Sequence, residues 1–250
     1  MCGRFAASAS TEDIIETFAI DEVVDEPLPT FNAAPTDPVP AVVERIDKGT
    51  DAVVRKLITP RWGLVPSWSK DARGGARMIN ARAETVDTKP AFRKAFAERR
   101  CLIPADGFYE WTPTTGPTGK PAKQPWFIRP AKDGPFVMAG LYEFWRDQTL
   151  GPDAPWLTTC TIITTQATDA LGHIHDRMPM TILREHWDAW LDPRVTAADG
   201  VRGLLHAPQG SEIDTYRVVP MVNNVRHDGP ELLTPVGNGG PDAPTTRKAW

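Results

Sequence analysis

The sequence predicts an α+β protein in which a mostly antiparallel β-structure forms the core and helices lie at its periphery. Short β-rich runs follow one another without regular alternation with helices, which disfavours a doubly wound sheet or a βα-barrel. A content of 25 prolines in 250 residues disfavours a bundle of long helices. The residues are 41% hydrophobic and 24% charged, which is typical of a soluble globular protein, and the length suits one large domain.

Three short helices are expected. Thr11 is placed to cap a helix over residues 12–18, because a threonine hydroxyl accepts hydrogen bonds from the first turn and acidic residues there favour the helix dipole. A second helix opens at Pro90, since proline is favoured at the first helical position. A third covers residues 184–191 and turns its tryptophans inward.

Eight β-rich runs, bounded by turn residues, are expected to form the strands. The first two flank Lys48-Gly49-Thr50 and predict a hairpin. Residues 112–124, rich in Thr, Gly, Pro and Lys, are expected to be a mobile hairpin tip. Residues 1–236 are expected to form the single domain, and residues 237–250 a disordered tail whose composition cannot bury a core. The expected strands are 39–46, 53–59, 100–103, 107–111, 126–129, 136–144, 157–165 and 215–220.

The three cysteines, Cys2, Cys101 and Cys160, form no Cys-x-x-Cys pair. This pattern argues against a disulfide framework or a zinc site and favours a reducing compartment. His173 and His175 have the spacing of a metal pair, but no third His or Cys ligand follows at a recognised spacing. No apolar run is suited to a signal peptide or a membrane span. We therefore expect a cytoplasmic protein without a metal, a cofactor or a membrane partner.

The net charge of −4 argues against a nucleic-acid partner, but the charges are unevenly distributed. Residues 11–26 contain seven acidic residues and no basic one, whereas residues 71–100 contain eight basic residues and four acidic ones. A local basic surface binds phosphates even on an acidic protein, because salt limits the relevant field to about 8–10 Å. The alternative is that residues 93–100 form a solvated helix face.

Cys2 is the most informative residue of the chain. An initiator methionine is usually removed before a small second residue, so Cys2 is expected to carry a free α-amine. Its amine and its thiol, with reference pKa values of about 7.7–8.0 and about 8.5, are both partly nucleophilic near neutral pH. Such a 1,2-aminothiol condenses with an aldehyde to a Schiff base, and the sulfur then closes a five-membered thiazolidine. The alternative is an ordinary residue in a frayed terminus.

Two segments have the chemistry of recognition sites. Trp62 and Trp68 bracket a Gly-Pro loop, and exposed tryptophans there would stack on nucleic-acid bases, unless they are core aromatics. Asn80, Arg82 and Glu84 alternate along the chain. In an extended segment they share one face, which suits them to orient a polar substrate, unless they form a solvated strand edge.

Glu110 and His175 are the candidate acid–base groups. Glu110 lies among three aromatic residues, whose burial of the carboxyl would raise its pKa toward the range of a general acid–base; a partly exposed strand glutamate is the alternative. His175 is followed by Asp176, which would orient the imidazole. Thr164, which lies between Glu110 and His175 in the sequence, stands at the end of a β-rich run.

Together these segments resemble the SRAP family (SOS-response-associated peptidase domain), whose members covalently capture abasic sites in single-stranded DNA. The match follows the family order and covers nearly the whole chain apart from the tail. Asn223-Asn224-Val225 resembles the closing segment of the family. The other matching segments are Met1-Cys2-Gly3-Arg4-Phe5, Phe31-Asn32-Ala33-Ala34-Pro35-Thr36, Trp62-Gly63-Leu64-Val65-Pro66, Asn80-Ala81-Arg82-Ala83-Glu84-Thr85, Ala105-Asp106-Gly107-Phe108-Tyr109-Glu110-Trp111, Thr164-Thr165 and Ile174-His175-Asp176-Arg177-Met178-Pro179.

The resemblance implies a β-barrel-like core flanked by helices, with a basic groove for single-stranded DNA that contains abasic sites. It implies that Cys2 forms a thiazolidine with the abasic-site aldehyde and that Asn80 positions the Cys2 amine or the sugar. Glu110 would shuttle protons, and His175 would help to open the deoxyribose ring. A nucleoid-associated monomer that protects abasic sites in the DNA damage response is expected. The residues along the DNA would be Arg4, Asn32, Trp68, Arg77, Arg82 and Thr164.

Two other functions remain open from the residues. The first is a cysteine peptidase with Cys2 as nucleophile and His175 as base, acting on its own N-terminus to remove Met1. The second is a non-catalytic nucleic-acid binding module that uses the tryptophans and the basic segment. A peptidase needs a thiolate but no free amine, whereas aldehyde capture needs both groups. A plain binding module would tolerate the loss of Cys2.

Overall fold

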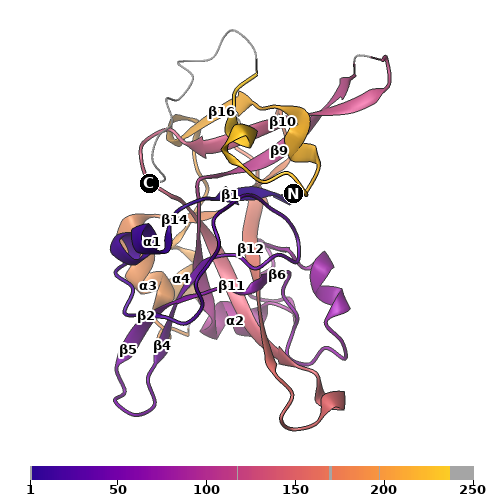
Figure 1. The fold of residues 1–250 in the computed structure, drawn as a ribbon. Helices are drawn as coiled ribbons and strands as arrows, with labels where there is room; N and C mark the ends of the chain where they lie inside the picture. Colours follow the sequence, from indigo (N-terminus) through magenta and orange to yellow (C-terminus); the bar gives the residue numbers. More distant parts are fainter. Residues whose placement is uncertain (1, 117, 169–170, 197, 237–250) are drawn as a thin grey trace.

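The structure is a computed structural model that describes residues 2–116, 118–168, 171–196 and 198–236. Its strands form two sheets, and most neighbouring strands run antiparallel (Figure 1). The smaller sheet contains the N-terminal strand and the long β9–β10 hairpin. Its five strands, in spatial order, are β16 (Ile213–Arg217), β10 (Pro121–Pro130), β9 (Gly107–Thr115), β1 (Phe5–Ala7) and β3 (Thr30–Ala33).

The larger sheet has eleven strands and contains three parallel pairs, namely β2 with β5, β6 with β12 and β7 with β12. Its main path is β13 (Arg177–Pro179), β12 (Trp156–Gln166), β11 (Phe136–Arg146), β8 (Arg100–Ala105), β4 (Ala41–Ile46), β5 (Val53–Ile58) and β2 (Glu22–Val23). The short strands beside this path are β6 (Arg61–Trp62), β7 (Asn80–Arg82), β14 (Thr181–Ile182) and β15 (Leu205–His206).

The fold is a mixed α+β single domain that is mostly sheet, as the sequence predicts. The barrel-like core implied by the resemblance is not confirmed. Within the described ranges the smaller sheet ends at β16 and β3, and the main path of the larger sheet ends at β13 and β2, so neither closes on itself. The expected boundary at residue 236 also remains a prediction, because residues 237–250 lie outside the described part of the chain.

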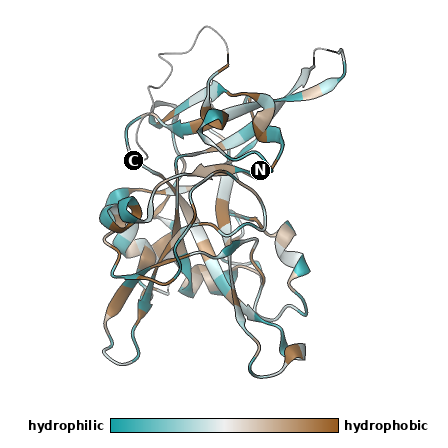
Figure 2. Ribbon diagram, in the orientation of Figure 1, coloured by the Kyte–Doolittle hydropathy of each residue, from teal (hydrophilic) through white to brown (hydrophobic). Residues whose placement is uncertain are grey.

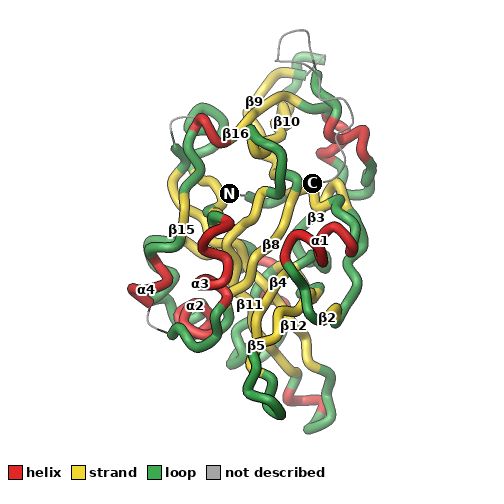
Figure 3. The backbone as a smooth tube through the Cα atoms, turned by 90° about the vertical axis from the view of Figure 1, so that its left-hand side faces the viewer, coloured by secondary structure: helices red, strands yellow, loops and turns green. Residues whose placement is uncertain are grey.

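The helices are short and pack on the larger sheet. Figure 3 shows α2, α3 and α4 grouped on one side of it, with α1 beyond β4. Phe18 of α1 stacks on Trp187 of α3, with ring centroids 4.5 Å apart, and both rings belong to the core between the helices and the sheet. No helix in the described residues is long and apolar enough to cross a membrane. The α-helices are α1 (Thr11–Phe18), α2 (Arg93–Glu98), α3 (Trp187–Leu191) and α4 (Ala198–Arg202). The 3₁₀ turns are η1 (Arg73–Arg77), η2 (Gln148–Leu150), η3 (Arg184–His186), η4 (Gly210–Glu212), η5 (Pro220–Asn223) and η6 (Pro230–Leu233).

Several local expectations differ from the structure. The second helix begins at Arg93 rather than at Pro90. The cap of α1 is Ser10 rather than Thr11: the Ser10 hydroxyl accepts a hydrogen bond from the N–H of Asp13 at 3.1 Å. The expected loop over residues 112–124 is mostly sheet, because β9 and β10 remain paired as far as Thr115 and Pro121. The Thr-rich part of β9 suits an extended ribbon, and this hairpin projects from the rest of the smaller sheet (Figure 1).

The space between the two sheets is filled by the core that anchors the N-terminal strand. Phe5 of β1 is paired with Phe108 of β9 and meets the ring of Trp62 edge-on, with centroids 5.0 Å apart. Trp62 is fully buried, so of the two tryptophans predicted as base-stacking groups only Trp68, which is 67% exposed, lies at the surface. Figure 2 shows hydrophobic residues along the central strands and a hydrophilic turn at the end of the β4–β5 hairpin.

The prediction that the basic residues of 71–100 form a phosphate-binding surface is wrong for Arg100, because its guanidinium is buried and stabilises the fold. All of its nitrogens donate to main-chain carbonyls, at distances of 2.6–3.0 Å, and none of these acceptors is a carboxylate. Carbonyls at a helix C-terminus lack partners within the helix, so one cation satisfies the ends of α2 and α3 together. The acceptors are the carbonyls of Phe96, Ala97, Trp190, Asp192 and Val195.

Gly63 and Gly75 bring the loop after β6 into contact with η1, which ends at Arg77. A Cβ atom on Gly75 would lie 2.5 Å from the carbonyl oxygen of Gly63, and a Cβ on Gly63 would lie 2.6 Å from that of Gly75. Gly63 also has a φ of 128°, which side chains rarely permit. These two backbones therefore approach so closely that only glycine fits, and this contact fixes the place of the exposed Arg77.

Gly75→Ala is expected to destabilise the protein by about 1–3 kcal/mol, because the added methyl group must displace backbone. Gly74→Ala is the matched control, since the nearest atom to its new methyl would be the end of the Met78 side chain at 3.7 Å. Urea unfolding of both variants measures the difference. Equal stability of the two variants would contradict the close approach of Gly63 and Gly75.

Candidate active site

Cys2 is fully buried and lies shortly before β1, a strand of the smaller sheet. Strand β1 begins at Phe5, after Gly3 and Arg4, and pairs with β3 on one side and β9 on the other. Asn80, at the start of β7, donates a hydrogen bond from Nδ2 to the main-chain carbonyl of Cys2 at 2.8 Å. Its position is set by the parallel pairing of β7 with β12, where Asn80 lies opposite Ile162. The predicted pair of Cys2 and Asn80 therefore meets, and Asn80 holds the backbone of Cys2.

Glu110 and His175 also come together, from strand β9 and from the loop before β13. Nε2 of His175 lies 3.9 Å from a carboxylate oxygen of Glu110. Glu110 is buried, and this burial, together with the nearby charge of Asp176, raises its pKa to about 7. A carboxyl with a pKa near neutral can both accept and donate a proton in one reaction cycle. The structure therefore gives Glu110 the acid–base property expected from its aromatic neighbours.

The thiol of Cys2 is held in its neutral form. Burial raises its pKa well above the ordinary value for a thiol, and the negative charge of Glu110 adds to the effect. Thiolate is the nucleophilic form of cysteine, so at neutral pH this sulfur reacts only when a base removes its proton during the reaction. The electrostatic coupling of Cys2 with Glu110 makes this carboxylate the candidate base.

His175 is neutral at neutral pH, because burial lowers the pKa of its imidazole. Its Nδ1 accepts a hydrogen bond from the main-chain N–H of Arg177 at 2.9 Å. The same nitrogen lies 2.9 Å from Oδ1 of Asp176, whose side chain is 86% exposed. Asp176 therefore stands beside the ring as the sequence predicts, but a second neighbour, the backbone of Arg177, competes with it for Nδ1.

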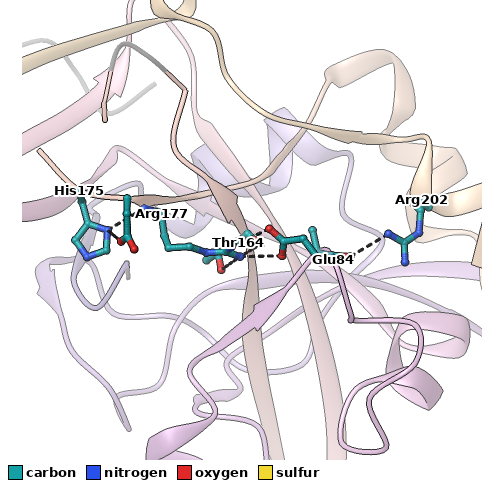
Figure 4. Close-up of polar contacts among 7 residues, drawn as sticks. Glu84, Thr164, His175, Arg177 and Arg202 are labelled. Carbon is teal, nitrogen blue, oxygen red and sulfur yellow. Dashed lines mark hydrogen bonds and ion pairs between the residues drawn. The ribbon is translucent and has the colours of Figure 1, made fainter. Parts of the chain in front are cut away.

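Arg177 joins three of the matching segments, and the sequence reasoning did not assign it a role. Figure 4 shows its side chain running from the His175 loop past Thr164 to Glu84. Two of its nitrogens reach the two carboxylate oxygens of Glu84, at 2.7 and 3.1 Å. One of them also donates to the carbonyl of Thr164 at 2.6 Å. An Arg that follows the His-Asp pair was visible in the sequence, but its partner depends on the pairing of β7 and β13 with β12.

A polar cavity of about 360 Å³ opens beside this network. Two arginines and one carboxylate contribute to its wall, so it offers both cationic and anionic groups to a polar ligand. A phosphate and its sugar match such a lining better than an apolar ligand does. The lining residues are Arg82, Gln166, Ala167, Asp176 and Arg177.

The six predicted DNA contacts divide into two groups. Trp68, Arg77 and Arg82 are exposed and available to a ligand. Thr164 is buried, and its hydroxyl lies 3.2 Å from an Arg177 nitrogen. Arg4 and Asn32 bind each other rather than facing outward, as their hydrogen bonds show.

Arg4 donates to Oδ1 of Asn32 at 2.7 Å and to the carbonyl of Val222 at 2.9 Å. Asn32 is only 3% exposed, and its amide donates to the carbonyls of Asn224 and His227. The Asn223-Asn224-Val225 region therefore belongs to the support of β1 and β3. In the structure Arg4 and Asn32 fasten the N-terminal strand to the C-terminal segment.

Trp126 is a site residue that the sequence reasoning missed. It lies directly opposite Glu110 in the pairing of β10 with β9. Its Nε1 donates to the hydroxyl of Thr112 at 3.0 Å, and its ring meets that of His173 edge-on at 6.0 Å between centroids. Side chains opposite each other in a sheet share a face, so Trp126 is a neighbour of Glu110 on that face. Only the register of the hairpin, which the sequence does not fix, reveals this neighbour.

His173 faces Trp126 whereas His175 faces Glu110, so the two histidines do not converge on one ligand. Within the described ranges, no three His, Cys, Asp or Glu side chains gather as metal ligands would. The site is therefore built from a thiol, an amide, a carboxyl and an imidazole.

Glu110→Gln is expected to stabilise the protein at pH 8 more than at pH 5. Because folding raises the pKa of Glu110 from 4.5 to about 7, stability falls as pH rises through this window. A glutamine of the same shape carries no charge, so it removes the loss of stability at pH 8. Melting temperatures of the variant and the wild type at both pH values measure the effect. The exposed Glu16→Gln on α1 is the control, and an equal temperature difference at both pH values for Glu110→Gln would contradict the raised pKa.

The chain resembles known proteins over most of its length. Residues 1–225 match the family model described as SOS response associated peptidase (SRAP). The chain is 40% identical over 235 residues to the abasic site processing protein YoqW of Bacillus subtilis (strain 168), covering 93% of this chain and 99% of that one. It is 31% identical over 242 residues to the abasic site processing protein HMCES of Mus musculus, covering 84% of this chain and 66% of that one.

The fold also resembles a solved structure of a protein from Bacteroides thetaiotaomicron, with a TM-score of 0.75 at 23% identity, covering 94% of this chain and all of the other. At that identity the likeness concerns the fold alone. The extent of the family match and the identity to YoqW decide the classification. The chain belongs to the SRAP family.

Proposed function

We propose that this protein binds single-stranded DNA and captures the aldehyde of an abasic site as a thiazolidine on Cys2, thereby protecting the site during the DNA damage response. Its relatives are named abasic site processing proteins, which supports DNA with abasic sites as the partner. The observation that carries the proposal is the meeting of Cys2 with Asn80 and of Glu110 with His175. The amine that reacts is that of Cys2 after removal of Met1.

The reaction needs proton transfers at three stages, and Glu110 and His175 carry them. Ring opening of the closed sugar breaks the bond between C1′ and the ring oxygen, which gains a proton while the C1′ hydroxyl loses one. The Cys2 amine then adds to the C1′ aldehyde, and water leaves to give an iminium ion. Finally the sulfur attacks C1′ and loses its proton. The sum is one aldehyde and one aminothiol giving one thiazolidine and one water.

Each site residue has a role that follows from its surroundings. Asn80 holds the carbonyl of Cys2 and so fixes the direction of the amine. Glu110, with its pKa of about 7, takes a proton from the amine or thiol and returns one when water leaves. His175, which is neutral in this setting, donates a proton to the ring oxygen during ring opening. Because the thiol is neutral at rest, the amine attacks first and the sulfur closes the ring.

We further propose that Trp68, Arg77 and Arg82 contact the DNA directly, since they are exposed and lie in or before the basic segment. The other three act indirectly. Arg4 and Asn32 fasten β1, and Thr164 holds Arg177. The functional unit is the monomer, spans residues 1–236 and acts in the cytoplasm at the nucleoid.

The family description also contains the word peptidase, and removal of Met1 by the protein itself is the second candidate function. A cysteine peptidase depends on a thiolate paired with a base. The raised pKa of the Cys2 thiol weighs against such a nucleophile at neutral pH. Aldehyde capture by the amine fits this site better.

Mixing the purified protein with a single-stranded oligonucleotide that contains one abasic site is expected to give an SDS-resistant shift on a gel. Cys2→Ala should abolish the shift, and Cys2→Ser should lose the stable adduct because an amine with a hydroxyl forms only a reversible Schiff base. Cys101→Ala, which removes another buried thiol, is the control and should crosslink. A stable shift with Cys2→Ala, or with a blocked N-terminus, would refute the aminothiol mechanism.

The double variant Arg77→Ala/Arg82→Ala is expected to weaken binding to any undamaged single strand alike. If both arginines contact phosphates, the slope of log affinity against log salt should flatten by about 1.4, at about 0.7 per contact. Arg93→Ala/Lys94→Ala removes two exposed charges on α2 and is the control with the same change in net charge. An unaltered slope in the first variant, measured by fluorescence anisotropy, would place the DNA elsewhere.

A further inference from the structure

Glu84 and Arg177 form an ion pair that has no role in the proposed reaction. It lies in the turn after β7 and pairs through both carboxylate oxygens with Arg177 at the start of β13 (Figure 4). The Arg177 side chain is 11% exposed and that of Glu84 is 45% exposed. A two-point pair of this kind fixes the direction of the guanidinium more strictly than a single contact does.

Contacts with other secondary-structure elements also hold both partners of the ion pair in place. Arg177 also donates to the carbonyl of Thr164 at the end of β12. On the other side, Arg202 of α4 donates to the carbonyl of Ala83 at 3.1 Å and forms an ion pair with Asp87. The turn that carries Glu84 is thus held at two points, and the carboxylate presents a fixed target to Arg177.

The backbone of Arg177 in turn fixes the ring of His175. Its N–H donates to Nδ1 of His175, so in the neutral ring Nδ1 is the acceptor and the hydrogen resides on Nε2. Nε2 is the nitrogen that lies 3.9 Å from Glu110. The opposite tautomer would carry its hydrogen on Nδ1 and donate it to Asp176, which lies at the same distance from Nδ1 as the Arg177 nitrogen.

We propose that Glu84 is a positioning residue which, by holding Arg177, selects the tautomer of His175 that presents an N–H at Nε2 toward Glu110. The inference rests on the proposed role of His175 in opening the sugar ring. In this tautomer the Nε2 proton passes to the ring oxygen as C1′–O breaks, and Glu110, which takes the proton of the C1′ hydroxyl, returns it to Nε2, so that the imidazole stays neutral. The opposing carboxylate of Asp176 is largely exposed, so solvent screens its attraction, whereas the anchored Arg177 N–H stays in place.

The tautomer can be read directly from the nitrogen resonances of His175. In ¹⁵N-labelled full-length protein at pH 8, long-range ¹H–¹⁵N correlation spectra distinguish a protonated from an unprotonated ring nitrogen. We expect Nδ1 of His175 to be unprotonated in the wild type. Glu84→Gln should shift the population toward protonated Nδ1. Glu44→Gln is the matched control, since it breaks the part-buried pair with Arg55 on β4 and β5 and should leave His175 unchanged.

A kinetic comparison tests the same inference independently. Glu84→Gln should slow crosslinking to a closed-ring abasic site by roughly 10- to 100-fold, below the full effect of removing a general acid. A pre-formed acyclic aldehyde on the same oligonucleotide should restore most of the rate. Glu84→Asp, which retains the charge, should reduce the crosslinking rate less than Glu84→Gln does. Glu84→Ala, which also removes the carboxylate, replaces Glu84→Gln in both experiments if the latter fails to fold.

The two measurements separate the inference from the proposed function. Unchanged nitrogen resonances in folded Glu84→Gln would overturn the positioning role even if crosslinking is slow. Protonated Nδ1 in the wild type would overturn it as well. If the wild type forms no adduct, the proposed function is wrong, whereas the resonances still decide whether Glu84 sets the tautomer.

Discussion

Strand β1 lies between β3 and β9, and the arrangement of the site depends on this pairing. It carries Cys2 into the core between the sheets and places it on the same side as Glu110, which stands on β9. The cost of ordering a chain terminus is offset by the burial of Phe5 against Trp62 and Phe108. Arg4 then fastens the strand to the C-terminal segment through the Val222 carbonyl. Cys2, near the start of the chain, is therefore a buried part of the interior.

Burial also sets the protonation states in the site. It raises the pKa of Glu110 and of the Cys2 thiol and lowers that of His175, in each case because water no longer stabilises the charged form. Near neutral pH the site therefore favours uncharged groups that can exchange protons with small differences in free energy. Uncharged groups of this kind favour a reaction in which each step transfers one proton. They do not stabilise a preformed thiolate.

Much of the fold could be predicted from the sequence, because local pattern determines it. The first helix, the β4–β5 hairpin and the strands around Glu110 follow from periodicity and turn residues. The β9–β10 ribbon was missed because its Thr and Pro residues are typical of loops, whereas pairing along the hairpin keeps them extended. The absence of barrel closure within the described residues depends on which strands meet, and no single segment contains that information.

The site was predictable in its reactive groups but not in their supports. Cys2, Glu110 and His175 have a recognisable chemistry in the sequence, and the structure brings them near one another. The burial of Arg100, Asn32 and Thr164 was not foreseen, because a charged or polar residue in the sequence gives no sign of the carbonyls that will satisfy it. The roles of Trp126 and Glu84 depend on strand register and on contacts between distant segments.

The most direct test of the central claim is tandem mass spectrometry of the adduct. The protein is incubated with an abasic single strand, treated with nuclease and trypsin, and the N-terminal peptide that ends at Arg4 is sequenced. We expect a peptide that begins at Cys2, lacks Met1 and carries the sugar remnant joined to both nitrogen and sulfur with loss of one water. An adduct on a lysine side chain, or on the sulfur of a peptide that still contains Met1, would contradict capture by an N-terminal aminothiol.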